Sequence, residues 1–319
     1  MVIRSRYFLI FSLIILLIAS SCDNSSQKVE AKKGVLDLSQ WSFTQDGNIP
    51  LNGEWEFYWG KLLTPYDFNF GNSQQKTGYF SVPEIWNGYL INGKPLEGQG
   101  YATFRLRITN IRTPDTLAIR VRDLATSYQL WINGRLLLQN GVVSDKPDQT
   151  VPQFIPSLAS FLPKGGEIKL VLQIANYNHR KGGPWKAILL GTEANITKLR
   201  ERQLALELFL FGILIIMVLY HLGLYLTRRK DRAPFYFSLI CLAIALRVLL
   251  GGERFLMWMF PGFDWELEQK LEFLTFYAIG PLFLIFLVSV FPELRIRIFK
   301  IVGLVSLVFS VLTILLPAK

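Results

Sequence analysis

The pattern of apolar residues changes sharply near residue 200, and this change constrains the fold more than any other feature of the 319-residue sequence. Before it, apolar and polar residues alternate in short runs, as they do in half-buried β-strands. After it, apolar residues are nearly continuous over stretches of about 20 residues, the length that a helix needs to cross a bilayer. The sequence therefore predicts a β-domain joined to a bundle of transmembrane helices.

The composition agrees with two coexisting regimes. Hydrophobic residues make up 51% of the chain, which is high for a soluble domain, and charged residues make up 18%, which is high for a purely membranous one. The net charge of +10 does not indicate nucleic-acid binding, because the basic residues lie between apolar runs rather than in one patch. Cys22 and Cys241 predict no disulfide, and the absence of a His or Cys cluster predicts no metal site and no cofactor.

The N-terminal segment has the pattern of an export signal. Arg4 and Arg6 precede an apolar run over residues 7–18, and small residues then lead to Cys22. The small-small-Cys ending is similar to a bacterial lipobox, which would make Cys22 a lipidated residue, although Ala19 stands where leucine is preferred. Ordinary cleavage, or none, with Cys22 incidental, is the alternative. The polar residues 23–34 predict a flexible tether.

Residues 35–200 predict an antiparallel β-sandwich or jelly roll of about eight strands. Alternation with period two predicts strands at residues 101–108, 116–122 and 168–174. Between two further runs, Asn133-Gly134 predicts a type I′ hairpin turn, because both central residues of that turn need positive φ.

Four segments in this region resemble galactose-binding-like jelly rolls in their order and spacing. They are similar to the sugar-binding domain of glycoside hydrolase family 2, over roughly residues 48–190, and they imply a fold more firmly than a ligand. The segments are LNGEWEFYW at 51–59, VPEIW at 82–86, GYATFRLR at 100–107 and LWING at 130–134.

The sequence does not indicate an enzyme. Glu54, Glu56 and Glu84 are carboxylates in strand or loop contexts, and their spacing does not establish the facing pair that a glycosidase needs. In the glycosidases that the domain resembles, the catalytic acids lie in a separate barrel domain. We therefore expect a binding domain.

Aromatic residues beside hydrogen-bonding groups are candidates for contact with a carbohydrate or another small polar ligand. The alternative is that Trp86 and Tyr101 belong to the core and that Arg105 lies on a solvated strand face. The polar and aromatic 176–185 loop is the stronger candidate, since loops carry function, although it could instead rest on the membrane-facing end of the domain. The candidates are Trp86, Asn87, Tyr101, Arg105, Tyr128, Asn176, Asn178, His179, Arg180 and Trp185.

Four apolar runs predict four transmembrane helices. The basic segments 228–232 and 295–300 should face the cytoplasm, because Lys and Arg collect in cytoplasmic loops. Residues 23–203 are then extracytoplasmic, in agreement with the export signal, and the chain is a multi-pass protein of a bacterial inner membrane. The runs span about residues 204–226, 234–250, 271–291 and 298–316.

Charged residues inside these runs need partners or an interfacial position. Glu207 and Arg247 both lie toward the outer ends of their predicted helices, which predicts an ion pair between them; snorkelling of each to the interface is the alternative. His221 is interpreted as a helix-packing hydrogen bonder.

Residues 220–239 and 245–250 resemble the start of the membrane module in seven-transmembrane receptors with diverse intracellular signalling modules. That bacterial family joins an extracytoplasmic jelly roll to seven helices and a cytoplasmic output domain. The resemblance implies a receptor that senses a carbohydrate or other small ligand. Only four apolar runs are present, so the resemblance implies that three helices and an output are missing, either because the product is truncated or because another polypeptide supplies them.

The alternative function is a membrane-anchored envelope protein that binds glycan or protein without signalling. The expected partners are the membrane, a carbohydrate or other small ligand, and a cytoplasmic signalling protein or a second copy of the chain; nucleic acid is not expected.

Overall fold

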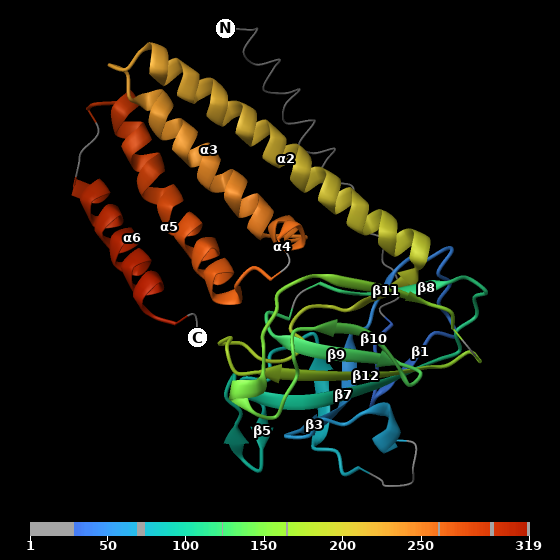
Figure 1. Ribbon diagram of the computed structural model, residues 1–319. Helices are drawn as coiled ribbons and strands as arrows, with labels where there is room; N and C mark the ends of the chain where they lie inside the picture. Colours follow the sequence, from blue (N-terminus) through green and yellow to red (C-terminus); the bar gives the residue numbers. More distant parts are fainter. Residues whose placement is uncertain are drawn as a thin grey trace, which may run out of the picture.

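A β-domain and a bundle of helices lie at opposite ends of the molecule in the computed structural model (Figure 1). The structure describes residues 29–68, 74–122, 124–163, 165–260, 262–293 and 297–317. The predicted export signal and the predicted lipidation site at Cys22 lie outside these residues.

The larger of two facing sheets is antiparallel except for one strand. In it, β1 (Val35–Asp37) pairs in parallel with β7. The other strands follow the order β10 (Arg135–Asn140), β9 (Ser127–Ile132), β12 (Ile168–Asn176), β7 (Gly100–Thr109), β3 (Gly53–Trp59) and β4 (Gly78–Val82).

The smaller sheet lies between the larger one and the helices. Its strands follow the order β11 (Ser157–Phe161), β8 (Leu117–Val121), β13 (Leu189–Thr192) and β2 (Ile49–Pro50). A separate hairpin joins β5 (Leu90–Ile91) to β6 (Lys94–Pro95), and two 3-10 turns, η1 (Pro65–Phe68) and η2 (Pro147–Gln149), lie in loops. The described residues thus form thirteen strands rather than the predicted eight or so, because strands of two or three residues are too short to show alternation.

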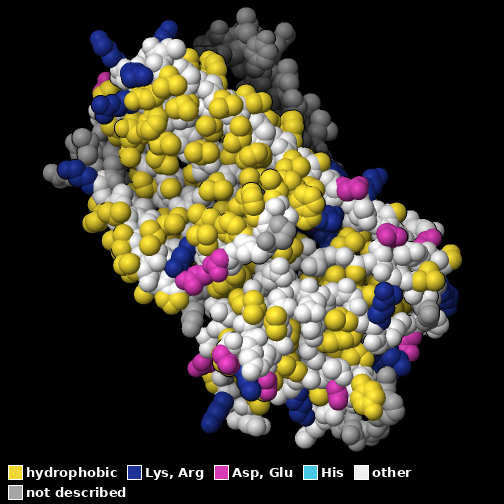
Figure 2. Space-filling model, viewed as in Figure 1, with side chains coloured by type: hydrophobic (Ala, Val, Ile, Leu, Met, Phe, Trp, Pro, Cys, Tyr) yellow, Lys and Arg dark blue, Asp and Glu magenta, His cyan; other side chains and the backbone are white. Residues whose placement is uncertain are grey.

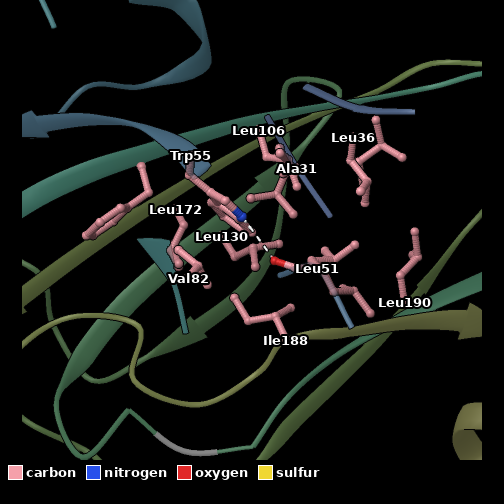
Figure 3. Packing of buried hydrophobic residues seen from close by; sticks show 14 of the residues in the cluster. Ala31, Leu36, Leu51, Trp55, Val82, Leu106, Leu130, Leu172, Ile188 and Leu190 are labelled. Carbon is pink, nitrogen blue, oxygen red and sulfur yellow. Dashed lines mark hydrogen bonds between the residues drawn. The ribbon is translucent and has the colours of Figure 1, made fainter. Parts of the chain in front are cut away.

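The core fills the space between the two sheets. Alternate residues of β7 and β12 point into it, and the register pairs Phe104 with Leu172 on this face. Figure 3 shows Trp55 among these aliphatic side chains, with its indole Nε1 donating to the Leu51 carbonyl at 3.0 Å. Each fully buried side chain of this size contributes about 1.5–3 kcal/mol. The predicted β-sandwich is confirmed.

The predicted hairpin is also confirmed. Asn133 and Gly134 connect β9 to β10 with φ values of 50° and 85°, which are the positive values that a type I′ turn requires. The Asn133 side chain accepts a hydrogen bond from the Lys169 backbone N–H at 2.8 Å, so it ties the turn to β12.

Four long helices form the other half, and each packs against the next along the chain (Figure 1). Three of them are long and apolar enough to cross a membrane, namely α2 (Glu193–Thr227), α3 (Ala233–Leu250) and α5 (Trp265–Val290). A fourth apolar helix, α6 (Arg297–Leu315), packs on α5, and the short α4 (Phe255–Met259) follows α3. Figure 2 shows hydrophobic side chains covering the exposed face of this half, as a lipid environment requires.

The sandwich passes directly into the first long helix. Thr192 ends β13 and is also the N-cap of α2, where its side chain accepts from the Asn195 N–H at 3.3 Å. The helix α2 is unbroken from Glu193 through the first apolar run. The chain therefore has no loop at this connection that could absorb a rotation of the sandwich.

Candidate functional site

The turn after α3 brings charged side chains between the sandwich and the helices. Residues 251–254 have the sequence Gly-Gly-Glu-Arg, and Gly252 and Arg254 adopt φ values of 55° and 53°. These left-handed conformations reverse the chain at the end of α3 and send consecutive side chains in different directions. We call these four residues the 251–254 turn. The turn and the residues that its side chains contact, Arg120, Phe154 and Glu268, together form what we call the junction.

Glu253 reaches the sandwich. It accepts a hydrogen bond from Arg120 of β8, a residue that is only 1% exposed. The same guanidinium donates to Gln203 of α2 at 2.6 Å, and Arg200 of α2 lies 3.6 Å from the other carboxylate oxygen of Glu253. Burial lowers the pKa of Arg120, and the Glu253 carboxylate acts in the opposite direction. The buried Arg120 side chain thus connects β8 to α2 through Gln203 and to the turn through Glu253.

The backbone of the turn is held by α2. Both carboxylate oxygens of Glu207 accept from the Glu253 N–H, at 3.2 and 3.1 Å. A Cβ at Gly252 would clash with this carboxylate, so glycine is needed here both for space and for its positive φ.

Arg254 reaches in the other direction, to α5. It forms ion pairs with Glu268 and with Glu272, the second at 3.2 Å. The face of its guanidinium lies 3.2 Å from the ring centroid of Phe154, which belongs to the sandwich. This cation–π contact gives the sandwich a second attachment to the helices.

The expected ion pair between Glu207 and Arg247 is not present in the structure. The Glu207 carboxylate is occupied by the backbone of the 251–254 turn. Arg247 instead donates to the Glu272 carbonyl at 2.8 Å and lies over the Phe276 ring at 5.2 Å. Both side chains therefore find partners, but the turn and α5 provide them.

Four of the candidate ligand residues have structural partners inside the sandwich. Trp86 and Tyr128 are fully buried in the core, and the Trp86 indole donates to the Gly98 carbonyl at 3.0 Å. Asn87 donates to the Arg180 carbonyl at 3.0 Å and accepts from the Gly182 N–H at 3.1 Å. Asn176, which is also fully buried, donates to carbonyls of the same loop. Asn87 and Asn176 therefore hold the 176–185 loop from within, whereas Tyr128 belongs to the core.

Arg105 lies on the outer face of the larger sheet, and Tyr101 lies on the same face of β7. Arg105 pairs with Glu56 at 3.3 Å and stacks on Phe68 at 4.7 Å. Glu56 also accepts from the Tyr58 hydroxyl at 3.0 Å; burial and this carboxylate raise the pKa of Tyr58 to about 12. Hollows of about 360 and 480 Å³ flank this group, so it offers an aromatic and charged surface to solvent.

The 176–185 loop faces the helices. His179 stacks on Trp185 with 6.1 Å between ring centroids, and its Nδ1 accepts from the Lys181 N–H at 3.1 Å. Burial lowers the pKa of His179, which favours the neutral ring. His179, Arg180 and Trp185 line a groove of about 440 Å³ together with α5 and α6, and Asn178 lines a neighbouring hollow with Trp265.

Sequence reasoning missed the junction residues Arg120, Phe154, Glu253 and Arg254. One signal was present, since Arg120 is the sole charged residue in LAIRV, the sequence of β8, and every position of that strand is buried. A charged residue in such a strand requires a partner. Nothing in the sequence pointed to Glu253 as that partner, because the two residues are 133 positions apart.

The helical half matches a known family, whereas the matches among solved structures are distant. A comparison with curated protein sequences found no match. Solved structures similar to part of the chain include a β-glucuronidase from Faecalibacterium prausnitzii (13% identity, TM-score 0.33) and a family 2 β-galacturonidase from Eisenbergiella tayi (11%, 0.30). Each match covers 45% of this chain but only 31% and 24% of those enzymes, so the chain spans about a quarter to a third of their length. Residues 203–319 match the family described as 7TM diverse intracellular signalling, which confirms the resemblance of this chain's membrane region to that family.

Proposed function

We propose that this chain is the sensory part of a membrane signalling receptor, in which the sandwich detects a ligand and the junction passes its state to the helices. The observation that carries the proposal is the buried Arg120–Glu253 ion pair, which fixes β8 to the turn between α3 and α4. The family match of residues 203–319 supports the same function.

The geometry gives the sandwich two routes of influence on the helices. The first is covalent, because β13 continues into α2 without a loop. The second is the 251–254 turn, which contacts Arg120 and Phe154 on one side and Glu268 on the other. A tilt of the sandwich relative to the bundle would move α2. The 251–254 turn would then either move with the sandwich or lose the ion pairs of Glu253 and Arg254. Signalling then requires a ligand that binds the two arrangements with different affinity.

We propose a carbohydrate or other small polar ligand, and the outer face around Arg105, Glu56 and Phe68 as its site. This surface combines a guanidinium, a carboxylate and an aromatic ring, which suits hydroxyl-bearing or acidic sugars. In this proposal Tyr101 extends the same face. The 176–185 loop is turned toward the helices and suits a different ligand, considered below.

We further propose that the sandwich is extracytoplasmic and that α2, α3, α5 and α6 cross a bacterial inner membrane. Figure 2 shows Lys and Arg gathered at the end of the bundle far from the sandwich, where Arg228, Arg229, Lys230 and Arg232 are exposed. Basic residues on that side support a cytoplasmic location for it. In this topology an output module or partner would meet the helices opposite the sensor.

The test is a panel of neutral sugars and uronic acids added to the full chain in nanodiscs. A ligand is expected to raise the Tm in a saturable way, because it binds the folded state alone. Hydrogen exchange should then change both near Arg105 and in the 251–254 turn. Replacing Arg105 with Gln should remove binding, whereas Arg120→Met should keep binding and remove the change in the turn. A ligand whose effect stays within the sandwich would instead support the anchored envelope protein.

A further inference from the structure

A groove between the sandwich and the last two helices has a polar end and an apolar end. Its volume is about 440 Å³. His179, Arg180 and Lys181 of the 176–185 loop form the end at the sandwich. From there the groove runs between α5 and α6, where its walls are Phe273, Tyr277, Phe309, Leu312 and Leu316.

The apolar walls are built by helical spacing. Gln269, Phe273 and Tyr277 are four residues apart and therefore lie on one face of α5. The Tyr277 ring stacks on Phe273 at 6.2 Å and on Phe309 of α6 at 5.7 Å between centroids. Phe273 and Phe309 nevertheless remain 47% and 49% exposed, so the aromatic wall is open to whatever surrounds the helices.

The polar end is cationic and without acidic neighbours in the groove. None of the described residues that line the groove is Asp or Glu. Across the described ranges, neither Arg180 nor Lys181 forms an ion pair. The nearby Lys270, by contrast, already pairs with Glu266 at 2.8 Å. The loop thus holds two cations, beside a half-buried neutral histidine, over the mouth of the groove.

A third feature points to a ligand between these two ends. Gln269 lines the groove and is only 5% exposed, yet its Nε2 amide has no hydrogen-bond partner among the described residues. Buried polar groups are normally hydrogen-bonded, because leaving a donor unpaired costs free energy. Gln269 is the polar residue of α5 that lines the groove.

We propose that this groove binds an anionic phospholipid. The phosphate would lie beneath Arg180 and Lys181, an ester or phosphate oxygen would accept from Gln269 Nε2, and an acyl chain would follow Phe273, Tyr277 and Phe309 along the helices. A soluble sugar or inorganic anion would match only the polar end, and a lipid without a phosphate only the apolar end. In a zwitterionic phospholipid, Arg180 and Lys181 would repel the cation of the head group. Bound there, one lipid molecule touches the sandwich and both helices, so the lipid composition of the membrane would influence how the sandwich sits on the bundle.

The experiment is native mass spectrometry of the full chain in detergent, with phosphatidylglycerol and phosphatidylcholine titrated separately. We expect phosphatidylglycerol to bind at least ten times more tightly. The double variant Arg180→Gln, Lys181→Gln should lose this preference, whereas a matched control with Arg135→Gln and Lys94→Gln, which removes two exposed cations elsewhere, should retain it. Equal affinity for the two lipids, or a preference that survives in the double variant, would overturn the proposal.

Two further arms separate the lipid from other occupants. Gln269→Leu should weaken phosphatidylglycerol binding several-fold while leaving the Tm of the lipid-free protein unchanged or raised, because it removes an unpaired amide. Leu312→Trp should fill the groove and weaken binding of the lipid. Glycerol 3-phosphate binding as tightly as the lipid would assign the site to a soluble anion, and a dimer that Leu312→Trp abolishes would assign the groove to a second copy; either result contradicts the phospholipid.

Discussion

The sandwich core and the junction are held together by opposite kinds of interaction. In the core, Trp55, Phe104 and Leu172 pack among apolar neighbours with no exposed surface. At the junction, Arg120 and Arg254 form buried ion pairs with Glu253 and Glu268. Apolar burial is non-directional and survives small displacements, whereas a buried ion pair depends on precise geometry. A small displacement of the sandwich relative to the helices would therefore break the ion pairs of the junction before it disturbed the core.

The junction is also incompletely satisfied. Among the described residues, the Arg120 Nε and Nη1 atoms and the Arg254 Nε atom are buried without a hydrogen-bond partner. A buried polar network with unpaired members is less stable than a fully paired one. An arrangement that paired these atoms would gain their hydrogen bonds, and a switch requires a second state of this kind.

The largest expected effect comes from breaking the junction with Arg120→Met. The change removes the buried partner of Glu253 and leaves only the partly exposed Arg200 at 3.6 Å, which should cost about 3–5 kcal/mol of the free energy of unfolding. Adding Glu253→Met should restore most of the loss, because two apolar side chains can replace a buried pair. Chemical unfolding of the full chain in nanodiscs measures both. A double variant as unstable as the sum of the two singles would show that the residues are not coupled.

A core truncation should be nearly as costly but behave differently. Leu172→Ala removes a fully buried side chain of β12 and should cost about 2–5 kcal/mol, since a cavity remains. In a double variant, the losses of unfolding free energy from Leu172→Ala and Arg120→Met should simply add. As a control, Leu136→Ala on the exposed side of β10 should cost below about 0.5 kcal/mol. Strong coupling between Leu172 and Arg120 would contradict the separation of core and junction.

Replacing the glycine in the turn should have a smaller effect. Gly252→Ala introduces a Cβ against the Glu207 carboxylate at a positive φ, and we expect a cost of about 1–3 kcal/mol. Gly262→Ala is the matched control, since Gly262 also has positive φ but nothing lies within 4 Å of the added Cβ. The difference between the two losses in unfolding free energy measures the contact with Glu207, and equal losses would exclude it.

The smallest effect should be a pH dependence of the 176–185 loop. Burial lowers the pKa of His179 below its ordinary value of 6.5, and neighbouring cations act in the same direction. When the loop unfolds locally, His179 becomes exposed and binds a proton more tightly than in the folded loop. The stability of the folded loop should therefore not depend on pH above 6.5, and it should decrease as the pH falls toward the lowered pKa. Hydrogen exchange of the loop between about pH 5 and 7.5 measures this, and His179→Gln should remove the dependence. A loop that becomes more protected in acid would contradict the neutral, buried ring.

Local patterns predicted the parts of the structure that depend on local chemistry. The alternation of residues 101–108 predicted β7, and Asn133-Gly134 predicted the hairpin, because each pattern encodes its own backbone geometry. The outward face of Arg105 also followed from alternation.

The junction was not predictable because it depends on how two folded parts meet. Arg120 and Glu253 come from a strand and a turn 133 positions apart, and no local pattern relates them. For the same reason Glu207 and Arg247 were paired with each other on the basis of depth alone, whereas the structure inserts the 251–254 turn beside Glu207. The roles of the individual ligand residues remain predictions.

Hydrogen exchange of the Arg120→Met variant shows whether the junction couples the sandwich to the helices. The substitution lies in the sandwich, yet we expect faster exchange in the 251–254 turn and in the first two turns of α5, which Arg254 holds through Glu268 and Glu272. Leu172→Ala, with a comparable loss of stability, should leave those amides unchanged. Exchange changes confined to the sandwich in both variants would contradict the claim that the junction couples the sandwich to the helices.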